Sequence, residues 1–270
     1  MLYFVYGMIA WNIRASFTDW NTAVPSSNFV GFANYSEVFQ DSLFWQSLKN
    51  TLLLFLVIPC SLGLGLFLAI LLNQKVRGAR IFMIIYLMPF AFSLVVTGKV
   101  WAWMFAPDNG AVNTILRSIG LDRLAGGWYT DTSTVMLSII IAMVWQFSGY
   151  CMLMLLAGMK SIPQKEIDAA KSKGASTFRI YRGVVLPRLK IPILTSVVVV
   201  MIFVLKAAFD LIRPWTGGGP GTSSYTLPIM VVNEAYAKTH VAYGAAVANI
   251  LVAVVLCIII PYVYWSYRGR

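Results

Sequence analysis

The stretch EIDAAKSKGASTFRIYRGVVLP, residues 166–187, is polar and helix-prone, with a glycine near its middle. It lies between two long apolar runs, about 134–159 and about 191–212. A transmembrane helix needs about 20 mostly apolar residues to cross a hydrocarbon core of about 30 Å. Both flanking runs meet that requirement, so the quoted stretch is expected to connect two membrane spans.

The whole chain has the composition of an integral membrane protein. Of its 270 residues, 59% are hydrophobic and 11% are charged, against about 25% charged residues in soluble domains. We expect a single all-α membrane domain over residues 1–270. The expected spans are about 2–17, 50–72, 81–104, 134–159, 191–212 and 245–265. The first span is short, reaching about 24 Å at about 1.5 Å per residue. A cleaved signal peptide is the alternative there, but the segment lacks a basic beginning.

Basic residues mark the loops expected on the cytoplasmic side. The 73–80 loop, the 160–190 loop and the C-terminal tail carry an excess of lysine and arginine, whereas the 18–48 and 105–133 loops carry more acidic than basic residues. The basic residues are Lys75, Arg77, Arg80, Lys160, Lys165, Lys171, Lys173, Arg179, Arg182, Arg188, Lys190, Arg268 and Arg270. This alternation predicts six spans with both termini in the cytoplasm.

Several chemistries lack their sequence motifs. The chain has no GxxxxGK[ST] phosphate loop, so it is not expected to bind ATP by that route. It also has no HExxH motif and no nucleophile elbow. The three cysteines fall in apolar runs and are read as buried and reduced, and His240 is read as a solvated loop histidine. We therefore expect no metal site, and the net charge of +11 follows membrane orientation rather than nucleic-acid binding.

Local signals predict a first short helix over residues 163–172. Pro163 suits the first turn of a helix, and Glu166 places negative charge near the positive end of the dipole. Ile167 and Ala170 then share one face. Gly174 is the expected stop, because glycine takes the left-handed conformation readily.

A second short helix is expected after the glycine. Ser176 can cap it, it runs through Phe178 and Tyr181, and Pro187 is expected to end it. The alternative is a basic amphipathic hairpin lying on anionic lipid. The mixture of acidic, basic and small residues favours a close protein contact instead.

At this point the segment resembles the "EAA" loop of permease subunits of ATP-driven, binding-protein-dependent importers. In that family the pattern runs roughly EAA-x-x-x-G, then about nine residues, then a hydrophobic residue-x-Leu-Pro. Here Asp168-Ala169-Ala170, Gly174 and Val185-Leu186-Pro187 match it. Asp168 replaces the usual glutamate, and Lys173 replaces the acid that usually precedes the glycine.

Other stretches extend the resemblance over nearly the whole chain. They are SFTDW (16–20), GFANYSEVFQD (31–41), RGARIFMIIYLMPFAFS (77–93), WAWMFAPDNGAVNTIL (101–116) and FDLIRPWTGGGPGTSSYTLPIMVVNEAY (209–236). Together they resemble the carbohydrate-uptake branch, in particular the F and A subunits of maltose and glycerol-phosphate systems. Relative to that family, the cytoplasmic half of the first helix is missing before Met1. Either the start is truncated or the chain relies on its remaining core helices.

The resemblance implies a MetI-like, type I importer permease that moves a sugar by alternating access and has no catalytic site of its own. It implies a second homologous permease subunit, two ATPase subunits that hold ATP and Mg, and an external solute-binding protein. No cofactor is expected on this chain, whose place is the cytoplasmic membrane of a bacterium or archaeon. The residues implied to contact the ATPase are Glu166, Asp168, Ala169, Ala170, Lys173, Gly174, Ala175, Phe178, Leu186 and Pro187.

Polar residues inside the spans are candidates for a solute path, because such groups are costly in a membrane. They are Gln146, Tyr150, Lys206, Asp210 and Asn249. Lys206 and Asp210 are spaced to pair on one helix face. The alternatives are a buried structural pair for these two and helix–helix hydrogen bonds for Gln146 and Asn249. Lys99 is read as a side chain that extends towards the membrane surface.

The glycine-rich loop Gly217, Gly218, Gly219 and Pro220 is expected to be flexible and to reach the external binding protein. A phosphate cradle is disfavoured because no Lys-Ser/Thr pair follows. Two other functions stay open: a carrier or channel driven by an ion gradient, which would normally show an inverted repeat, and a membrane-bound enzyme.

Overall fold

The computed structural model describes residues 2–74 and 77–267, and these residues are mostly helical, with one isolated bridge between Thr18 and Phe29. The α-helices are α1 (Leu2–Ala15), α2 (Ala33–Gln40), α3 (Ser42–Leu54), α4 (Val57–Asn73), α5 (Ala79–Leu87), α6 (Leu94–Met104), α7 (Ala111–Ser118), α8 (Val135–Lys160), α9 (Gln164–Ser172), α10 (Thr177–Ile180), α11 (Leu186–Arg188), α12 (Lys190–Ala207), α13 (Arg213–Trp215), α14 (Leu227–Val232) and α15 (Val241–Tyr267). Short 3₁₀ segments are η1 (Met88–Ala91) and η2 (Asp122–Leu124), and π-helical segments are η3 (Tyr181–Val185), η4 (Ala208–Ile212) and η5 (Asn233–Ala237).

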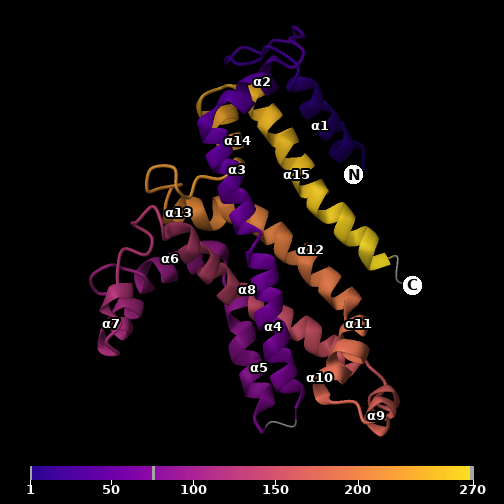
Figure 1. Ribbon diagram of the computed structural model, residues 1–270. Helices are drawn as coiled ribbons and strands as arrows, with labels where there is room; N and C mark the ends of the chain where they lie inside the picture. The colour runs from indigo at the N-terminus through magenta and orange to yellow at the C-terminus, as the bar shows by residue number, and fades with distance from the viewer. Residues whose placement is uncertain (1, 75–76, 268–270) are drawn as a thin grey trace.

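The helices form an elongated bundle with different elements at its two ends. α9, α10 and α11 lie at one end beside α4, while α2 and α14 lie at the other (Figure 1). α1 lies beside α15 at the edge of the bundle (Figure 1). The basic 160–190 segment is therefore at the opposite end of the bundle from α2, which belongs to the predicted external 18–48 loop.

Four helical stretches among the described residues are long and apolar enough to cross a membrane: Ser42–Asn73, Val135–Lys160, Lys190–Trp215 and Val241–Pro261. A fifth is obtained if the bent pair Ala79–Ala91 and Leu94–Met104 counts as one span. The predicted first span is the 14-residue helix α1, about 21 Å at about 1.5 Å per residue. Lys75, Arg268 and Arg270, which the orientation prediction counted, lie outside the described residues.

The predicted span over about 81–104 is a bent pair of helices and not one straight helix. The helix axis turns by 103° between Ala79–Ala91 and Leu94–Met104. Pro89, in the first half, supplies no backbone N–H for the helix, and the Ser93 hydroxyl accepts a hydrogen bond from Val96 N, which caps a new helix. A proline followed four residues later by a capping serine thus redirects the chain although the hydropathy stays high.

The second span begins earlier than predicted, at Ser42, and the Asp41 side chain caps it by accepting from Leu43 N. Part of the expected external loop after the fifth span is also helical, as α14 and η5. Because η5 contains polar residues, the hydropathy of the sequence did not predict a helix there.

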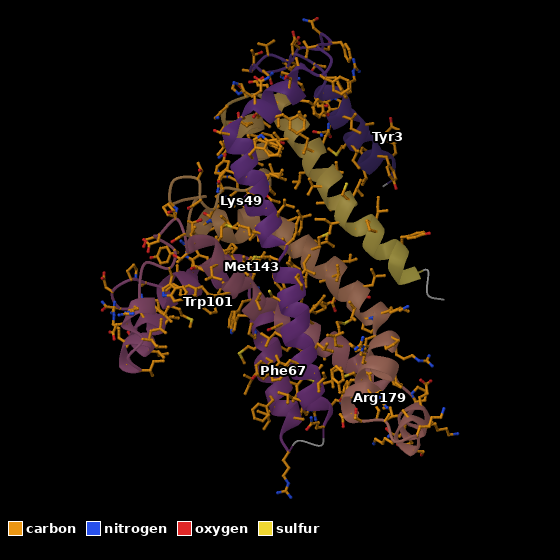
Figure 2. All side chains as sticks on the ribbon, viewed as in Figure 1. Tyr3, Lys49, Phe67, Trp101, Met143 and Arg179 are labelled. Carbon is orange, nitrogen blue, oxygen red and sulfur yellow. The ribbon has the colours of Figure 1, made fainter. Side chains whose placement is uncertain are left out.

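The core lies where α4, α8 and α12 meet. Met143, Phe147 and Ile139 of α8 are fully buried there, and Figure 2 shows Met143 at the middle of the bundle. Gly65 lets α4 approach α8 closely, since a Cβ at this position would lie 2.6 Å from Cys151 Cβ. Cys151 is buried, but Cys60 and Cys257 are exposed on this chain, which corrects the prediction that all three are buried.

Candidate functional site

The segment 164–188 folds as the expected helix-turn-helix. α9 ends in a Schellman motif in which Ala175 N donates to Ala170 O at 3.2 Å and Gly174 N donates to Lys171 O at 2.8 Å. Gly174 has φ +72°, the left-handed conformation that this motif requires. The predicted stop at Gly174 is confirmed.

The second helix starts at the predicted cap and continues one residue further than expected. The Ser176 hydroxyl accepts from Arg179 N, and α10 passes into the π-helical segment η3 and then into α11. Pro187 lies one residue before the end of this helical run, which extends to Arg188.

An apolar base fixes this helical hairpin, residues 164–188, to the transmembrane helices. Ile180, Val185 and Leu189 are buried against Leu68 and neighbouring residues of α4 and α8. Ile167 and Ala170, which were predicted to share one face of α9, pack against the same cluster. The hairpin, α4 and α8 therefore share one buried apolar cluster.

The opposite face of the hairpin is exposed. Phe178 is 74% exposed, which is unusual for a large aromatic residue in a polar segment. Asp168, Ala169, Lys173 and Gly174 are also exposed, and Figure 2 places neighbouring Arg179 at this end of the bundle. Ala175 and Leu186 instead pack against the apolar base.

Gln146 holds the break in the bent helix pair. It is 2% exposed, and its Nε2 donates to Phe92 O at 2.8 Å. Phe92 lies between the two halves of the bend, so the amide satisfies a carbonyl released by the broken helix. Gln146 Oε1 is buried without a hydrogen-bond partner among the described residues.

Tyr150, Lys206 and Asp210 lie around one aromatic cluster. Tyr150 stacks on Phe90 with ring centroids 4.8 Å apart, and Phe90 contacts Phe203 edge-on. Lys206 Nζ lies 5.9 Å from the Phe203 ring centroid and 3.7 Å from Asp210 Oδ2. The two charged side chains are 59% and 42% exposed, so they form a surface pair on this chain and not a buried one.

Asn249 is located away from this cluster, between α15 and α1. Its Oδ1 accepts from Asn12 Nδ2 at 2.7 Å, and its Nδ2 donates to Ser16 Oγ and Tyr35 OH, each at 3.0 Å. The structure thus places Asn249 in a helix–helix hydrogen-bond network. Lys99 is exposed, and its Nζ donates to Pro214 O at 2.9 Å.

The glycine-rich loop is internally hydrogen-bonded, which differs from the expected flexible loop. The Ser224 hydroxyl donates to Gly219 O at 2.6 Å and lies 2.7 Å from Thr216 Oγ1. Gly217, Gly218 and Gly221 have positive φ, which gives the loop its tight path. Asn50 Nδ2, from α3, donates to Thr222 O and Tyr225 O.

Three polar residues that hold loops and helix starts in place were not identified from the sequence. Asn50 anchors the glycine loop, Thr51 Oγ1 accepts from Leu227 N at the start of α14, and Asn113 donates to Ala106, Pro107 and Gly126 carbonyls. Each bonds to atoms distant in sequence or within an irregular loop, so spacing alone carries no signal for them.

A charged cluster follows the glycine loop. Glu234 is 4% exposed, its Oε1 accepts from Lys238 Nζ at 2.7 Å, and its Oε2 lies 3.2 Å from His240 Nδ1. The hydrogen bond to Glu234 raises the pKa of Lys238. His240 is exposed, as expected of a solvated loop histidine, and it also contacts Glu234. Among the described residues, no group of three or more His, Cys, Asp or Glu side chains could hold a metal ion.

This arrangement, several apolar helices with an exposed helical hairpin at one end, is that of a multi-pass membrane protein. Residues 61–265 match the family described as "Binding-protein-dependent transport system inner membrane component". The chain belongs to this family.

Similar proteins share most of their length with this chain. A probable ABC transporter permease protein of Pyrococcus horikoshii is 51% identical over 99% of this chain and 91% of its own. The xylose/arabinose import permease protein XacH of Haloferax volcanii is 34% identical over 98% of this chain and 83% of its own.

The fold is also that of a solved importer. A bacterial ABC transporter involved in the import of the acidic polysaccharide alginate matches with a TM-score of 0.81, covering 99% of this chain and 91% of that chain at 22% sequence identity. The MetI-like all-α fold expected from the sequence is therefore confirmed.

Proposed function

We propose that this chain is the transmembrane permease subunit of an ATP-driven importer for a sugar, either a monosaccharide or an oligosaccharide. The observation that carries the proposal is the hairpin 164–188, with its apolar base packed on α4 and α8 and its Phe178 side exposed. Relatives named for xylose/arabinose, diacetylchitobiose and trehalose/maltose transport support a sugar as the solute.

The exposed face of the hairpin is the proposed contact with an ATPase subunit. Phe178 would insert into an apolar pocket of that subunit, and Asp168 and Lys173 would pair with charges at its rim. ATP and Mg are bound by the two ATPases, and this subunit performs no covalent chemistry. Closure of the ATPases moves the hairpin, and the apolar base transmits that movement to α4 and α8, giving alternating access.

A second, homologous permease subunit is proposed to complete the pore. The exposed Lys206–Asp210 pair lies in an apolar span, where uncovered charges are costly, so a protein partner or a watery path is expected to cover it. Tyr150 beside this pair supplies an aromatic surface and a hydroxyl, both suited to a sugar. Gln146, whose buried Oε1 has no hydrogen-bond partner in the described part of the chain, and Asn249 are the remaining proposed path residues.

The external end is proposed to receive a solute-binding protein. Gly217, Gly218, Gly219 and Pro220 would contact it through backbone groups held in place by Ser224 and Asn50. Both termini are assigned to the cytoplasm, in the inner membrane of a bacterium or archaeon.

The test is reconstitution of the full transporter with Phe178→Ala and, as a matched control, Phe67→Ala. Both phenylalanines are exposed, but Phe67 lies on α4 and is not among the residues that pack against the hairpin. We expect Phe178→Ala to lower ATPase co-purification and ATP-driven sugar uptake at least tenfold, with Phe67→Ala near wild type. Unchanged uptake by Phe178→Ala would contradict the docking role. Sugar uptake by this chain alone in liposomes under an ion gradient would instead indicate a carrier.

A further inference from the structure

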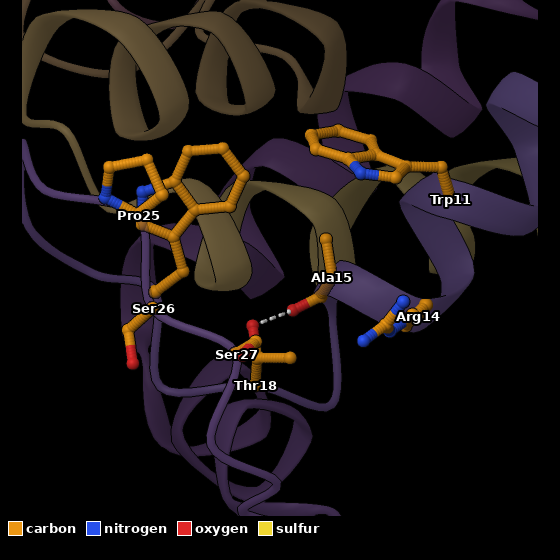
Figure 3. A pocket seen from close by; sticks show the side chains of 8 residues that line it. Trp11, Arg14, Ala15, Thr18, Pro25, Ser26 and Ser27 are labelled. Atoms are coloured by element: carbon orange, nitrogen blue, oxygen red, sulfur yellow. Dashed lines mark hydrogen bonds between the residues drawn. The ribbon is translucent and has the colours of Figure 1, made fainter.

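A cavity of about 350 Å³ lies at the end of α1, between this helix and the segment 20–27 (Figure 3). Its polar and aromatic lining consists of Trp11, Arg14, Thr18, Trp20, Ser26 and Ser27. Its volume falls in the range of about 300–1,000 Å³ typical of small-molecule sites. None of these residues has a part in the proposed import mechanism.

The cavity has walls that are fixed by the protein itself. Trp20 O accepts from Ala242 N at 2.8 Å, which ties the segment to the start of α15. Asn34 Nδ2 donates to Ser16 O at 2.9 Å and Thr18 O at 2.8 Å. The site therefore needs little ordering before a ligand binds, which favours affinity.

The negative end of the α1 dipole is largely satisfied within the protein. Thr18 N and Thr18 Oγ1 both donate to Ala15 O, and the Ser16 hydroxyl donates to Ile13 O. Figure 3 shows the Thr18–Ala15 bond at the floor of the cavity. The final carbonyls of the helix are thus occupied and repel an incoming anion less than free carbonyls would.

The polar side chains that line the cavity can donate hydrogen bonds, and one of them, Arg14, carries a positive charge. Arg14 is exposed at the rim, and Trp20 keeps its Nε1–H buried without a hydrogen-bond partner among the described residues. No carboxylate lines the cavity, and the neighbouring Asp19 is bound by Ser26 of the lining and by Asn28, which lower the pKa of its carboxyl. A guanidinium together with neutral donors suits a phosphate, whose oxygens arginine can bind with two parallel hydrogen bonds.

The position of the cavity indicates where such a phosphate comes from. Tyr3, Phe4 and Met8 of α1 are 70–85% exposed, as expected of a helix that faces lipid. α1 packs on α15, on the side away from α3 and α12 (Figure 1). Trp11 and Trp20, with ring centroids 5.6 Å apart, are the residue type enriched at membrane surfaces. We propose that this cavity binds the phosphate group of an anionic membrane lipid, through Arg14 and Trp20 Nε1, with Trp11 against the glycerol part.

The test is native mass spectrometry of the purified, delipidated full chain in detergent, titrated with phosphatidylglycerol. We expect Arg14→Gln to weaken retention about tenfold, which corresponds to about 1.4 kcal/mol. Trp20→Phe removes the N–H and keeps most of the ring, so it is expected to weaken retention about threefold. Diacylglycerol, which has the tails without the phosphate, is expected to bind poorly.

Lys49→Gln is the matched control, because it removes one exposed positive charge on α3 outside this cavity. An equal loss in Lys49→Gln and Arg14→Gln would overturn the site, since unspecific charge would then retain the lipid. Equal retention by wild type, Arg14→Gln and Trp20→Phe would overturn it as well. Displacement of the lipid by millimolar inorganic phosphate, or preferential binding of an oligosaccharide, would reject a membrane lipid as the ligand.

Discussion

Arg188 Nη2 donates to Glu166 Oε1 at 2.6 Å and so joins the end of α11 to the first turn of α9. The two side chains are 60% and 33% exposed. An ion pair at that exposure contributes about 0–1 kcal/mol to folding. The pair is therefore better placed to fix the angle of the hairpin than to hold the protein together.

Charge reversal at this pair tests that role. We expect Glu166→Arg and Arg188→Glu each to lower ATP-driven uptake several-fold, while the unfolding temperature in detergent changes little. The double variant restores opposite charges in the same place and is expected to recover most of the uptake. Additive losses in the double variant would show that the residues act separately.

Close packing of α4 on α8 yields a prediction about stability. Gly65→Ala would place its Cβ 2.6 Å from Cys151 Cβ and 2.8 Å from Met152 N, so the helices must separate. Overpacking of this kind costs about 1–3 kcal/mol. Gly63→Ala on the same helix meets nothing within 4 Å and is expected to be neutral. Thermal unfolding of the two variants in detergent measures the difference, and equal unfolding temperatures would contradict the packing.

Local patterns predicted those parts of the molecule that depend on nearby residues. The Schellman end at Gly174 and the Ser176 cap follow from interactions within a few positions, and both occur as expected. The long apolar runs also became helices, because hydropathy over about 20 residues is itself the physical requirement for a span.

The sequence did not predict the change in chain direction at the bend or the hydrogen bonds between residues far apart in sequence. Hydropathy over 81–104 records composition and is insensitive to the 103° bend. The contacts of Asn50 with the loop near Thr222 and of Asn249 with α1 join residues more than 170 positions apart. A polar residue in a span therefore signals that a partner exists, without revealing whether that partner is another helix or a solute.

The Glu234–Lys238 pair predicts a pH dependence of stability. The pKa of Lys238 is raised by its hydrogen bond to Glu234, so the folded protein holds this proton more tightly than the unfolded chain. The resulting stabilisation is complete below the unfolded pKa of about 10.4 and is lost as the pH rises through the higher folded value. Lys238→Met is expected to unfold at a lower temperature than wild type from pH 7 to 9, and the two curves should converge as the pH rises through the folded pKa of Lys238. A difference that stays constant throughout this rise in pH would contradict the linkage.

Because Gly174 has a left-handed conformation, its substitution is predicted to weaken the coupling between the hairpin and the ATPase without causing a steric clash. A Cβ there meets nothing within 4 Å, so the cost of substitution is confined to the backbone, about 1–2 kcal/mol for an ordinary residue at positive φ. Gly174→Val is expected to loosen the hairpin and reduce ATPase co-purification and uptake, with normal amounts of protein in the membrane. Gly174→Asn is expected to stay near wild type, because asparagine tolerates this conformation.

Gly183→Ala is the matched control: Gly183 lies in the same hairpin, has open space and lacks a positive φ. If Gly183→Ala and Gly174→Val impair uptake equally, the turn geometry is not what the ATPase contact requires.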